Sequence, residues 1–267
     1  MMYFFAQGHK PFNLNYYHPN YKKHIIGEIR EGDNIDCLNR VFSEYCQMYY
    51  VWKNMKFNDD DILTFCHYSR QINPKHVNEK WIKGGMIQAY YLNKYKIKVD
   101  KNVKYNLVEG FIKYTRIPYF VYKDLEEYLD SQKILDSNKI MDYMNMENME
   151  YHTRMIFSMR YDKFKELMEF LQGYVDFVAN KYNIKKKGDW ITHCKNKFIE
   201  HFRKVGSKNA SFSQMLFQHK NNYNKIYNAD YGLNGPCNCW RVYSYIFEYL
   251  VSTFIHLNNY FYNTMYQ

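Results

Sequence analysis

The feature that most constrains the fold is a pair of short apolar runs with an amphipathic segment between them. Residues 2–6 (MYFFA) and 62–66 (ILTFC) have the length and composition of buried strands. Between them, apolar side chains recur at the spacing of one helix face: Val41, Phe42, Tyr45, Met48, Tyr49 and Trp52. Asn39 stands where an N-cap is expected, and the helix should end near Asn54. The order strand, helix, strand is typical of an α/β sheet.

Later segments extend this pattern. We expect short strands at residues 89–92 and 155–159. We expect helices at residues 123–135, 161–182 and 240–257. Residues 13–31 are polar and predicted to be irregular, and the lysine-rich stretch 185–188 is predicted to be disordered. A chain of 267 residues is long for one domain and short for two, so we expect one domain.

The second apolar run opens directly into His67, Tyr68, Ser69 and Arg70. In open α/β sheets, ligands bind in the crevice outside the carboxyl ends of the strands. Arginine can hold a diphosphate through two parallel hydrogen bonds, and histidine can donate or accept near neutral pH. The alternative is a strand-end histidine with satisfied hydrogen bonds beside a solvated arginine, and the residues alone leave both open.

Other candidate sites are weaker. Residues 8–10 (GHK) should reach the same sheet edge, but one glycine cannot form a phosphate cradle. Residues 32–35 (GDNI) have the composition of an ordinary turn. Residues 59–61 (DDD) precede their strand, away from the crevice, so a solvated turn is favoured over a metal site. Arg241 and Glu248 share one helix stripe and fit either a tuned general base or a salt bridge.

The formal net charge of +10 suits a nucleotide phosphate, a polyanion or an anionic membrane surface. Lysines spread over many surfaces give the same charge without any partner. The six cysteines show no paired C-x-x-C spacing, so we expect reduced thiols in a cytoplasm-like compartment. Residues 1–6 are too short for a signal sequence, and the apolar run 250–255 is too short to span a membrane.

Several short motifs then follow one another in a familiar order: residues 8–11 (GHKP), 25–27 (IIG), 32–35 (GDNI), 42–54 (FSEYCQMYYVWKN) and 66–70 (CHYSR). They resemble the H-K-P, I-x-V-G, G-D-N-I-S, W-A-W-K-N and C-H-Y-R-R motifs of domain-of-unknown-function family 4422. That family comprises glycosyltransferases of capsular and exopolysaccharide gene clusters. Residues 155–159 and 241–248 resemble its M-F-I-M strand and its R-x-F-G-F-I-S-E motif more loosely. The resemblance covers most of the chain apart from residues 74–150.

This resemblance implies an α/β, GT-A-like fold: a Rossmann-type mixed sheet flanked by helices, with a helical C-terminal part. Residues 1–267 would form one glycosyltransferase-like domain, with a donor-binding half at 1–120 and an acceptor-side, helical half at 121–267. The expected ligand is a nucleotide sugar, most simply UDP-linked. The strand that ends at His67 lacks an Asp-x-Asp metal motif, so Arg70 and Lys10 would neutralise the departing diphosphate instead. The need for a divalent metal stays open.

The resemblance also assigns roles to residues. The donor-binding set is His9, Lys10, Asp33, Asn34, His67, Tyr68 and Arg70. Glu248 would be the general base of an inverting reaction, with Asp33 as the second choice. The supporting set is Glu44, Trp52 and Arg241.

The predicted activity is transfer of a sugar to a glycan or lipid-linked acceptor in polysaccharide biosynthesis. We expect a cytoplasmic protein that could contact the inner face of a membrane through its basic surface. Ser69, Ser244 and Tyr249 depart from the arginine, glycine and arginine usual in the family, which leaves open a non-catalytic glycan- or nucleotide-binding module. A nucleic-acid binder ranks last, because the chain has no known nucleic-acid motif.

Overall fold

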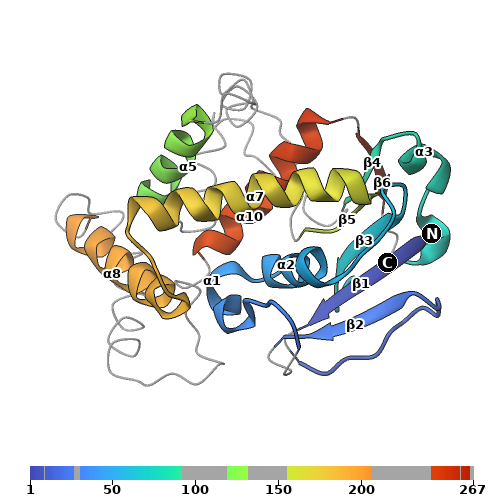
Figure 1. Ribbon diagram of the computed structural model, residues 1–267, viewed down its shortest axis with the longest axis horizontal. Coiled ribbons are helices and arrows are strands. Elements are labelled where there is room, and N and C mark those ends of the chain that lie inside the picture. The colour runs from blue at the N-terminus through green and yellow to red at the C-terminus, as the bar shows by residue number, and fades with distance from the viewer. Residues whose placement is uncertain are drawn as a thin grey trace, which may run out of the picture.

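The computed structural model describes residues 1–8, 10–26, 31–91, 119–131, 155–205, 242–258 and 260–264. Its strands form a six-stranded sheet in the order β2-β1-β3-β5-β4-β6 (Figure 1). The strands are β1 (Met2–Gly8), β2 (Tyr21–Ile25), β3 (Ile62–His67), β4 (Ile87–Tyr91), β5 (Phe157–Arg160) and β6 (Tyr260–Thr264). β5 is antiparallel to β3 and β4, whereas the other neighbouring pairs are parallel. The mixed α/β sheet predicted from the sequence is confirmed.

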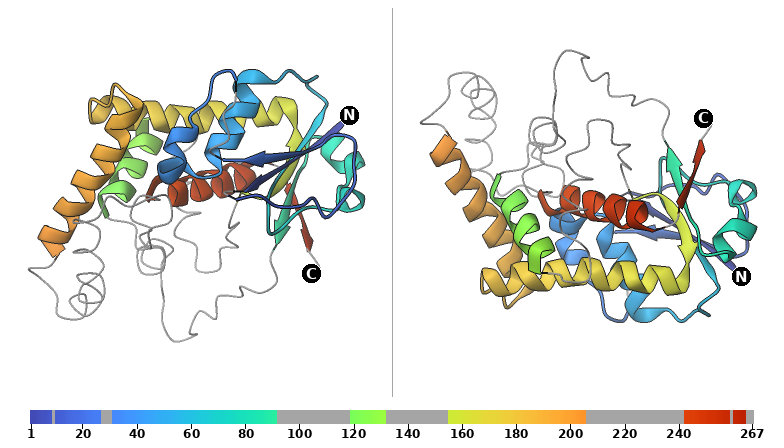
Figure 2. Two further views of the ribbon diagram at one scale, coloured as in Figure 1. Left: turned by 90° about the horizontal axis from the view of Figure 1, so that it is seen from below. Right: turned by 90° about the horizontal axis from the view of Figure 1, so that it is seen from above.

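The helices pack mainly against one face of this sheet. They are α1 (Asn39–Phe42), α2 (Tyr45–Asn54), α3 (Glu79–Lys83), α5 (Tyr119–Ser131), α7 (Tyr161–Lys181), α8 (Lys187–Val205) and α10 (Val242–Leu257), with short 3₁₀ turns η1 (Asp36–Leu38) and η2 (Pro74–His76). The long helix α7 runs beside α10, and α8 lies at the end of the molecule remote from the sheet (Figures 1 and 2).

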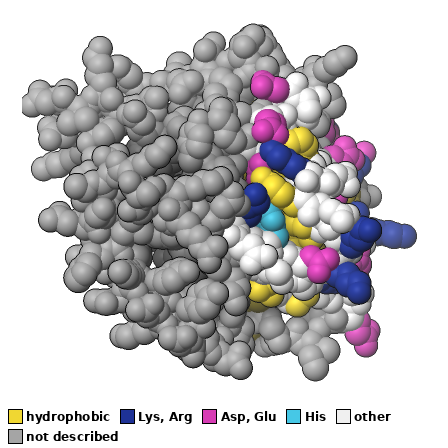
Figure 3. Space-filling model, turned by 90° about the vertical axis from the view of Figure 1, so that its left-hand side faces the viewer, with side chains coloured by type: hydrophobic (Ala, Val, Ile, Leu, Met, Phe, Trp, Pro, Cys, Tyr) yellow, Lys and Arg dark blue, Asp and Glu magenta, His cyan; other side chains and the backbone are white. Residues whose placement is uncertain are grey.

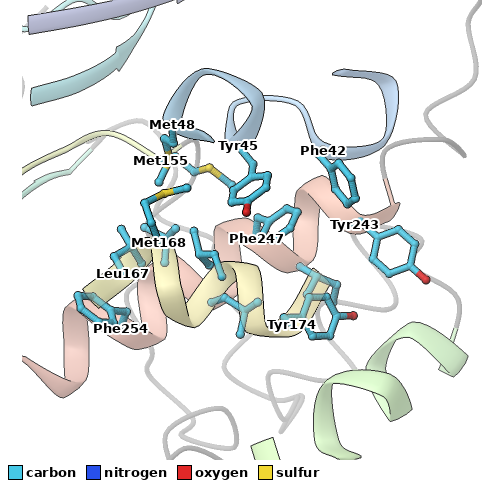
Figure 4. Packing of buried hydrophobic residues seen from close by; sticks show 14 of the residues in the cluster. Phe42, Tyr45, Met48, Met155, Leu167, Met168, Tyr174, Tyr243, Phe247 and Phe254 are labelled. Carbon is cyan, nitrogen blue, oxygen red and sulfur yellow. The ribbon is translucent and has the colours of Figure 1, made fainter. Parts of the chain in front are cut away.

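The main hydrophobic core lies between the sheet and α2, α7 and α10. Phe5, Leu63 and Phe65 enter it from the strands, and we name their side of the sheet the helix face. The ring of Tyr45 stacks on that of Phe247 with centroids 4.4 Å apart (Figure 4). The last helix, α10, therefore packs directly against α2.

The opposite side of the sheet, which we name the loop face, is covered by irregular chain. Phe4, Ala6 and Cys66 lie there in a second, smaller core cluster. Parallel strands need a long crossover, usually a helix, but here residues 10–20 join β1 to β2 without one. The amide of Gln71 ties this segment to residues 71–78: its Nε2 donates to the Asn13 carbonyl at 2.7 Å, and its Oε1 accepts from the Asn15 N–H at 2.8 Å.

Several sequence predictions of secondary structure were wrong. Residues 13–31 contain the edge strand β2, and the stretch predicted to be disordered runs into α8, where the Asp189 carboxylate accepts the N–H groups of Lys185 and Lys186. Asn39 is not an N-cap, because the cap position falls on Leu38. The predicted single helix is broken at Ser43, whose φ is 49°. The short β6 was also missed.

The Asp59–Asp61 turn is only partly solvated. Asp61 is buried, and its carboxylate accepts the Asn58 N–H at 2.9 Å and contacts the Met1 amine. Asp59 is exposed and pairs with Lys165 of α7 at 2.7 Å. The turn therefore links the start of β3 to the N-terminus and to α7.

Two further findings bear on the class of protein. Within the described residues, no helix is both long and apolar enough to cross a membrane. Cys37, Cys46, Cys66 and Cys194 are free thiols, and Cys237 and Cys239 lie outside the described residues.

Candidate functional site

The carboxyl ends of β1 and β3 meet at one edge of the sheet. The two strands are parallel neighbours, with Gln7 opposite His67. The polar residues that follow each strand therefore come together, as expected for an open α/β sheet. We name Lys10, His67, Tyr68, Ser69 and Arg70 the rim cluster.

A tight turn fixes the β3 part of the rim cluster. The Arg70 N–H donates to the His67 carbonyl at 2.9 Å, and the Ser69 N–H donates to Nδ1 of His67 at 3.3 Å. The Ser69 hydroxyl lies 2.7 Å from the same nitrogen. An Nδ1 that accepts from a backbone N–H carries no proton, so a neutral His67 holds its proton on Nε2.

Arg70 has an unmet hydrogen-bonding requirement. Its side chain is half-buried, and Nη1 is sealed from solvent without any hydrogen-bond partner. Buried polar groups are nearly always satisfied, and leaving one on a charged group unsatisfied is costly. An acceptor atom, charged or neutral, would satisfy this nitrogen.

Lys10 approaches the same place from β1. Its Nζ lies 5.7 Å from the centre of the Tyr68 ring, and the ring of Phe12 lies 5.8 Å from that of Tyr68. Gly8 permits this packing, because a Cβ there would lie 2.7 Å from the Phe12 ring. The structure thus brings Lys10, His67, Tyr68 and Arg70 together, while His9 lies outside the described residues.

A row of polar side chains, missed by the sequence analysis, crosses three strands on the helix face. His24, Gln7 and His67 are in register on β2, β1 and β3. The outer two Cα positions are about 10 Å apart, two strand spacings. Gln7 is 2% exposed, and its Nε2 donates to the Ser43 carbonyl at 3.4 Å. The signal available in the sequence was a lone glutamine directly after a strand of apolar residues.

The polar row lies beneath the α1–α2 junction. The positive φ of Ser43 places its carbonyl over Gln7, and the Tyr50 ring packs edge-on against His24 at 5.8 Å. Gln7 Oε1 and Gln47 Nε2 have no hydrogen-bond partner, although both side chains are buried. Such unsatisfied amides are unusual away from functional sites.

Asp33 is held by the C-terminal end of α2, and Asn34 follows it in the chain. The Asn54 side chain accepts the Asp33 N–H at 2.8 Å and donates to the Asp33 carbonyl at 2.7 Å. The Tyr49 hydroxyl donates to Asp33 Oδ2 at 2.9 Å. Burial and this bond raise the pKa of Tyr49 to about 12. Asp33 itself is exposed, so its carboxylate remains accessible to a ligand.

The remaining predicted residues lie farther into the helical layer. Glu44 is half-buried at the start of α2, beside Ser43. Trp52 packs against the main core with Lys53 Nζ 3.6 Å from its ring centre. Glu248 is half-buried on α10, next to Phe247. Arg241 lies outside the described residues. The roles of all four stay predictions.

The described part of the chain holds no cluster of three or more histidine, cysteine, aspartate or glutamate side chains suited to a metal ion. The rim cluster contains two cationic side chains and one imidazole.

The fold is shared with a glycosyltransferase. The matched structure is described as the apo form of WbbM, a bifunctional glycosyltransferase, with a TM-score of 0.51 and 16% sequence identity. The match covers 98% of this chain but 44% of that one, so this chain spans less than half of its length. No protein-family model and no curated protein matches the sequence.

Proposed function

We propose that this chain is a glycosyltransferase that moves a sugar from a nucleotide-sugar donor, UDP-linked in the simplest case, to a glycan or lipid-linked acceptor. One observation carries the proposal: a sealed Arg70 guanidinium nitrogen without a partner at the open edge of an α/β sheet. A diphosphate oxygen would satisfy it through a charge-assisted hydrogen bond. His67 and Lys10 lie beside it on the same edge.

Electrostatics gives this site its catalytic part. Breaking the bond between the sugar and the diphosphate leaves negative charge on the leaving group. We propose that Arg70, Lys10 and the Nε2–H of His67 stabilise that charge. The proposal leaves open whether a divalent metal adds to this stabilisation.

The exposed loop that is held by the end of α2 carries polar groups suited to bind the donor's sugar or ribose. Asp33 and Asn34 carry acceptor and donor groups that hydroxyls recognise, and Asn54 and Tyr49 fix their backbone and carboxylate. We propose that this loop contacts the donor on the β2 side while the rim cluster contacts its phosphates on the β3 side.

The general base rests on the family resemblance. The motif around residues 241–248 resembles the R-x-F-G-F-I-S-E motif of family 4422, which places a glutamate at position 248. Glu248 is half-buried on α10. Asp33 is the second candidate. The shared fold with a glycosyltransferase supports the reaction class, not the individual roles.

Calorimetric titration tests the diphosphate assignment. Wild type and Arg70→Ala would each be titrated with UDP and with uridine, which lacks the phosphates. We expect Arg70→Ala to weaken UDP binding about 10- to 100-fold and to leave uridine binding unchanged. Lys75→Ala removes one nearby exposed positive charge and serves as the matched control. Equal UDP affinity in wild type and Arg70→Ala would remove Arg70 from the site.

The base assignment has a separate test. Glu248→Gln should keep nucleotide binding while sugar transfer falls about 100- to 10,000-fold, because the isosteric amide cannot accept the acceptor's proton. Transfer is measured with a panel of nucleotide sugars and acceptors. Unchanged turnover in the variant would transfer the base role to another residue.

A non-catalytic binding module is the second candidate. Ser69 stands where the family usually has an arginine, and its backbone and hydroxyl contact His67, as a residue with a structural role would. Such a module would bind nucleotides without consuming them. Detection of donor hydrolysis or of transfer would decide against it.

A further inference from the structure

The loop face carries a surface that extends beyond the rim cluster. Residues 10–23 and 70–78 cover this face and are joined through Gln71. Neither segment contains an aspartate or glutamate, although the whole chain has 27 of them. Apart from the rim-cluster residues Lys10 and Arg70, Lys23 and Lys75 are exposed on these segments, and Lys23 is in register with Ala6 of the loop face. Within the described residues, these two segments therefore carry positive charge and no acidic side chain.

Two hydrophobic side chains project from the same surface. Tyr17 is 95% exposed, and Leu14 is 37% exposed, both on the crossover between β1 and β2. Their neighbours on that crossover point inward: the His18 ring packs on Phe4 with centroids 4.9 Å apart, and Tyr16 packs against the smaller core. The inward contacts hold the crossover on the sheet, so Tyr17 and Leu14 are presented to solvent by an ordered backbone.

The segments over the loop face are fixed along their length. Gln88 of β4 donates to the His76 carbonyl at 2.7 Å and accepts the Asn78 N–H at 2.7 Å. Lys23 Nζ donates to the Phe12 carbonyl at 3.2 Å. Lys75 and Lys23 therefore sit on one rigid surface rather than on independent tails.

We propose that the loop face docks onto an anionic lipid bilayer. Lysines would contact anionic headgroups, and Tyr17 and Leu14 would enter the interface between headgroups and acyl chains. Tyrosine is favoured at that depth because its ring is apolar and its hydroxyl is polar. An aliphatic side chain such as Leu14 fits the acyl boundary, whereas it offers a nucleic acid neither charge nor a stacking face.

Docking by this face would place the rim cluster beside the bilayer. Phe12 belongs to the loop-face crossover and packs on Tyr68 of the rim cluster. If the proposed glycosyltransferase function holds, a lipid-linked acceptor would reach the rim from the membrane. Binding to the bilayer does not depend on that function and can be tested without any donor or acceptor.

The test is co-sedimentation of the full chain with vesicles. One set contains equal parts phosphatidylglycerol and phosphatidylcholine, and the other contains phosphatidylcholine alone. We expect binding to the anionic set and its decline as salt is added, since exposed charges are screened. Lys23→Glu/Lys75→Glu should lower the partition coefficient at least about 25-fold, at roughly fivefold for each lysine lost. Tyr17→Ser should lower it about fivefold without changing the salt dependence.

The matched control is Lys185→Glu/Lys186→Glu. These lysines are exposed and lie next to α8, and the described part of this side of the molecule carries both cationic and acidic side chains (Figure 3). The control has the same net charge as the double variant on the loop face, so it should bind vesicles nearly as well as wild type. Equal losses in both double variants would show a non-specific charge effect and overturn the proposal. So would wild-type binding to heparin or single-stranded RNA without binding to anionic vesicles.

Discussion

At the scale of single residues, the properties of the side chains at the sheet edge come from their immediate surroundings. Arg70 is a solvated cation by composition, but the turn after β3 seals one of its guanidinium nitrogens without a partner. Asp33 would be a mobile turn residue, yet Asn54 and Tyr49 hold it in place. At this scale, a contact of one atom can decide the effect of a substitution.

Gly32 tests the support of the Asp33 loop. Its φ is 90°, and a Cβ there would lie 2.1 Å from Asn54 Oδ1, the atom that accepts the Asp33 N–H. We expect Gly32→Ala to lower the free energy of unfolding by about 2 to 4 kcal/mol, because strain and the lost clamp combine. Gly85 has the same φ, but a Cβ there would meet no atom within 4 Å, so Gly85→Ala should cost only about 1 kcal/mol. Urea unfolding of both variants measures the difference, and equal losses would mean that the Asn54 clamp contributes nothing.

The pH dependence of stability tests the effect of His193, a largely buried imidazole outside the site. Burial, with a smaller contribution from Lys197, lowers its pKa to about 4, and its Nε2 lies 2.8 Å from the Tyr243 hydroxyl. The unfolded chain binds a proton near pH 6.5 that the folded chain refuses until about pH 4, so stability falls as the pH drops through this window. The loss should reach about 2 to 3 kcal/mol at the lower end.

The measurement is urea unfolding of wild type and His193→Gln at several pH values. The glutamine can still bond to Tyr243 but cannot titrate. The free energies of unfolding of the two proteins should therefore converge as the pH falls toward 4. Parallel pH dependence in both proteins would exclude His193 as the cause.

At the scale of elements, the contacts between helices decide how much each segment contributes. The α2–α10 contact joins residues 202 positions apart through the stacked rings of Tyr45 and Phe247. The α5–α7 contact depends on the Tyr128 hydroxyl, which donates to the Phe170 carbonyl at 2.8 Å. These contacts have no local sequence signature.

Substitutions at two helical glycines distinguish the effect of helix propensity on stability from the effect of side-chain packing. A Cβ at Gly173 in α7 would lie 2.6 Å from the Tyr128 hydroxyl, whereas a Cβ at Gly188 in α8 would meet no atom within 4 Å. We expect Gly188→Ala to stabilise by up to about 0.5 kcal/mol. Gly173→Ala should destabilise by about 1 to 2 kcal/mol, because the displaced tyrosine costs more than the gain in helix propensity. Thermal unfolding of both variants gives the signs, and a stabilising Gly173→Ala would contradict the α5–α7 packing.

At the scale of the whole molecule, the sheet is assembled from distant parts of the chain. β6 pairs with β4 over five positions, from Ile87 with Tyr260 to Tyr91 with Thr264. β5 enters between β3 and β4, so the centre of the sheet depends on a strand that follows the first half of the sequence. Such long-range pairing should make unfolding cooperative across the sheet.

A chain ending at Asn258 tests this assembly. Loss of β6 should lower the free energy of unfolding by roughly 2 to 4 kcal/mol and expose the edge of β4 to pairing with other molecules. Urea unfolding and light scattering after size-exclusion chromatography measure the two effects. If neither stability nor association changes, β6 contributes nothing to the sheet.

The sequence by itself determined those elements whose patterns are local and strong. Apolar runs specified β1 and β3, and helical periodicity specified α7 and most of α10. Because parallel strands end at a common edge, the order strand, helix, strand also brought the residues after β1 and β3 together.

The tertiary structure alone decided the rest. β2 is an edge strand with exposed lysines and lacks a strong apolar pattern. Ser43, whose carbonyl accepts from Gln7, breaks a helix that periodicity favours. The row of His24, Gln7 and His67 depends on register between strands, and no local pattern of one strand contains the position of its neighbour.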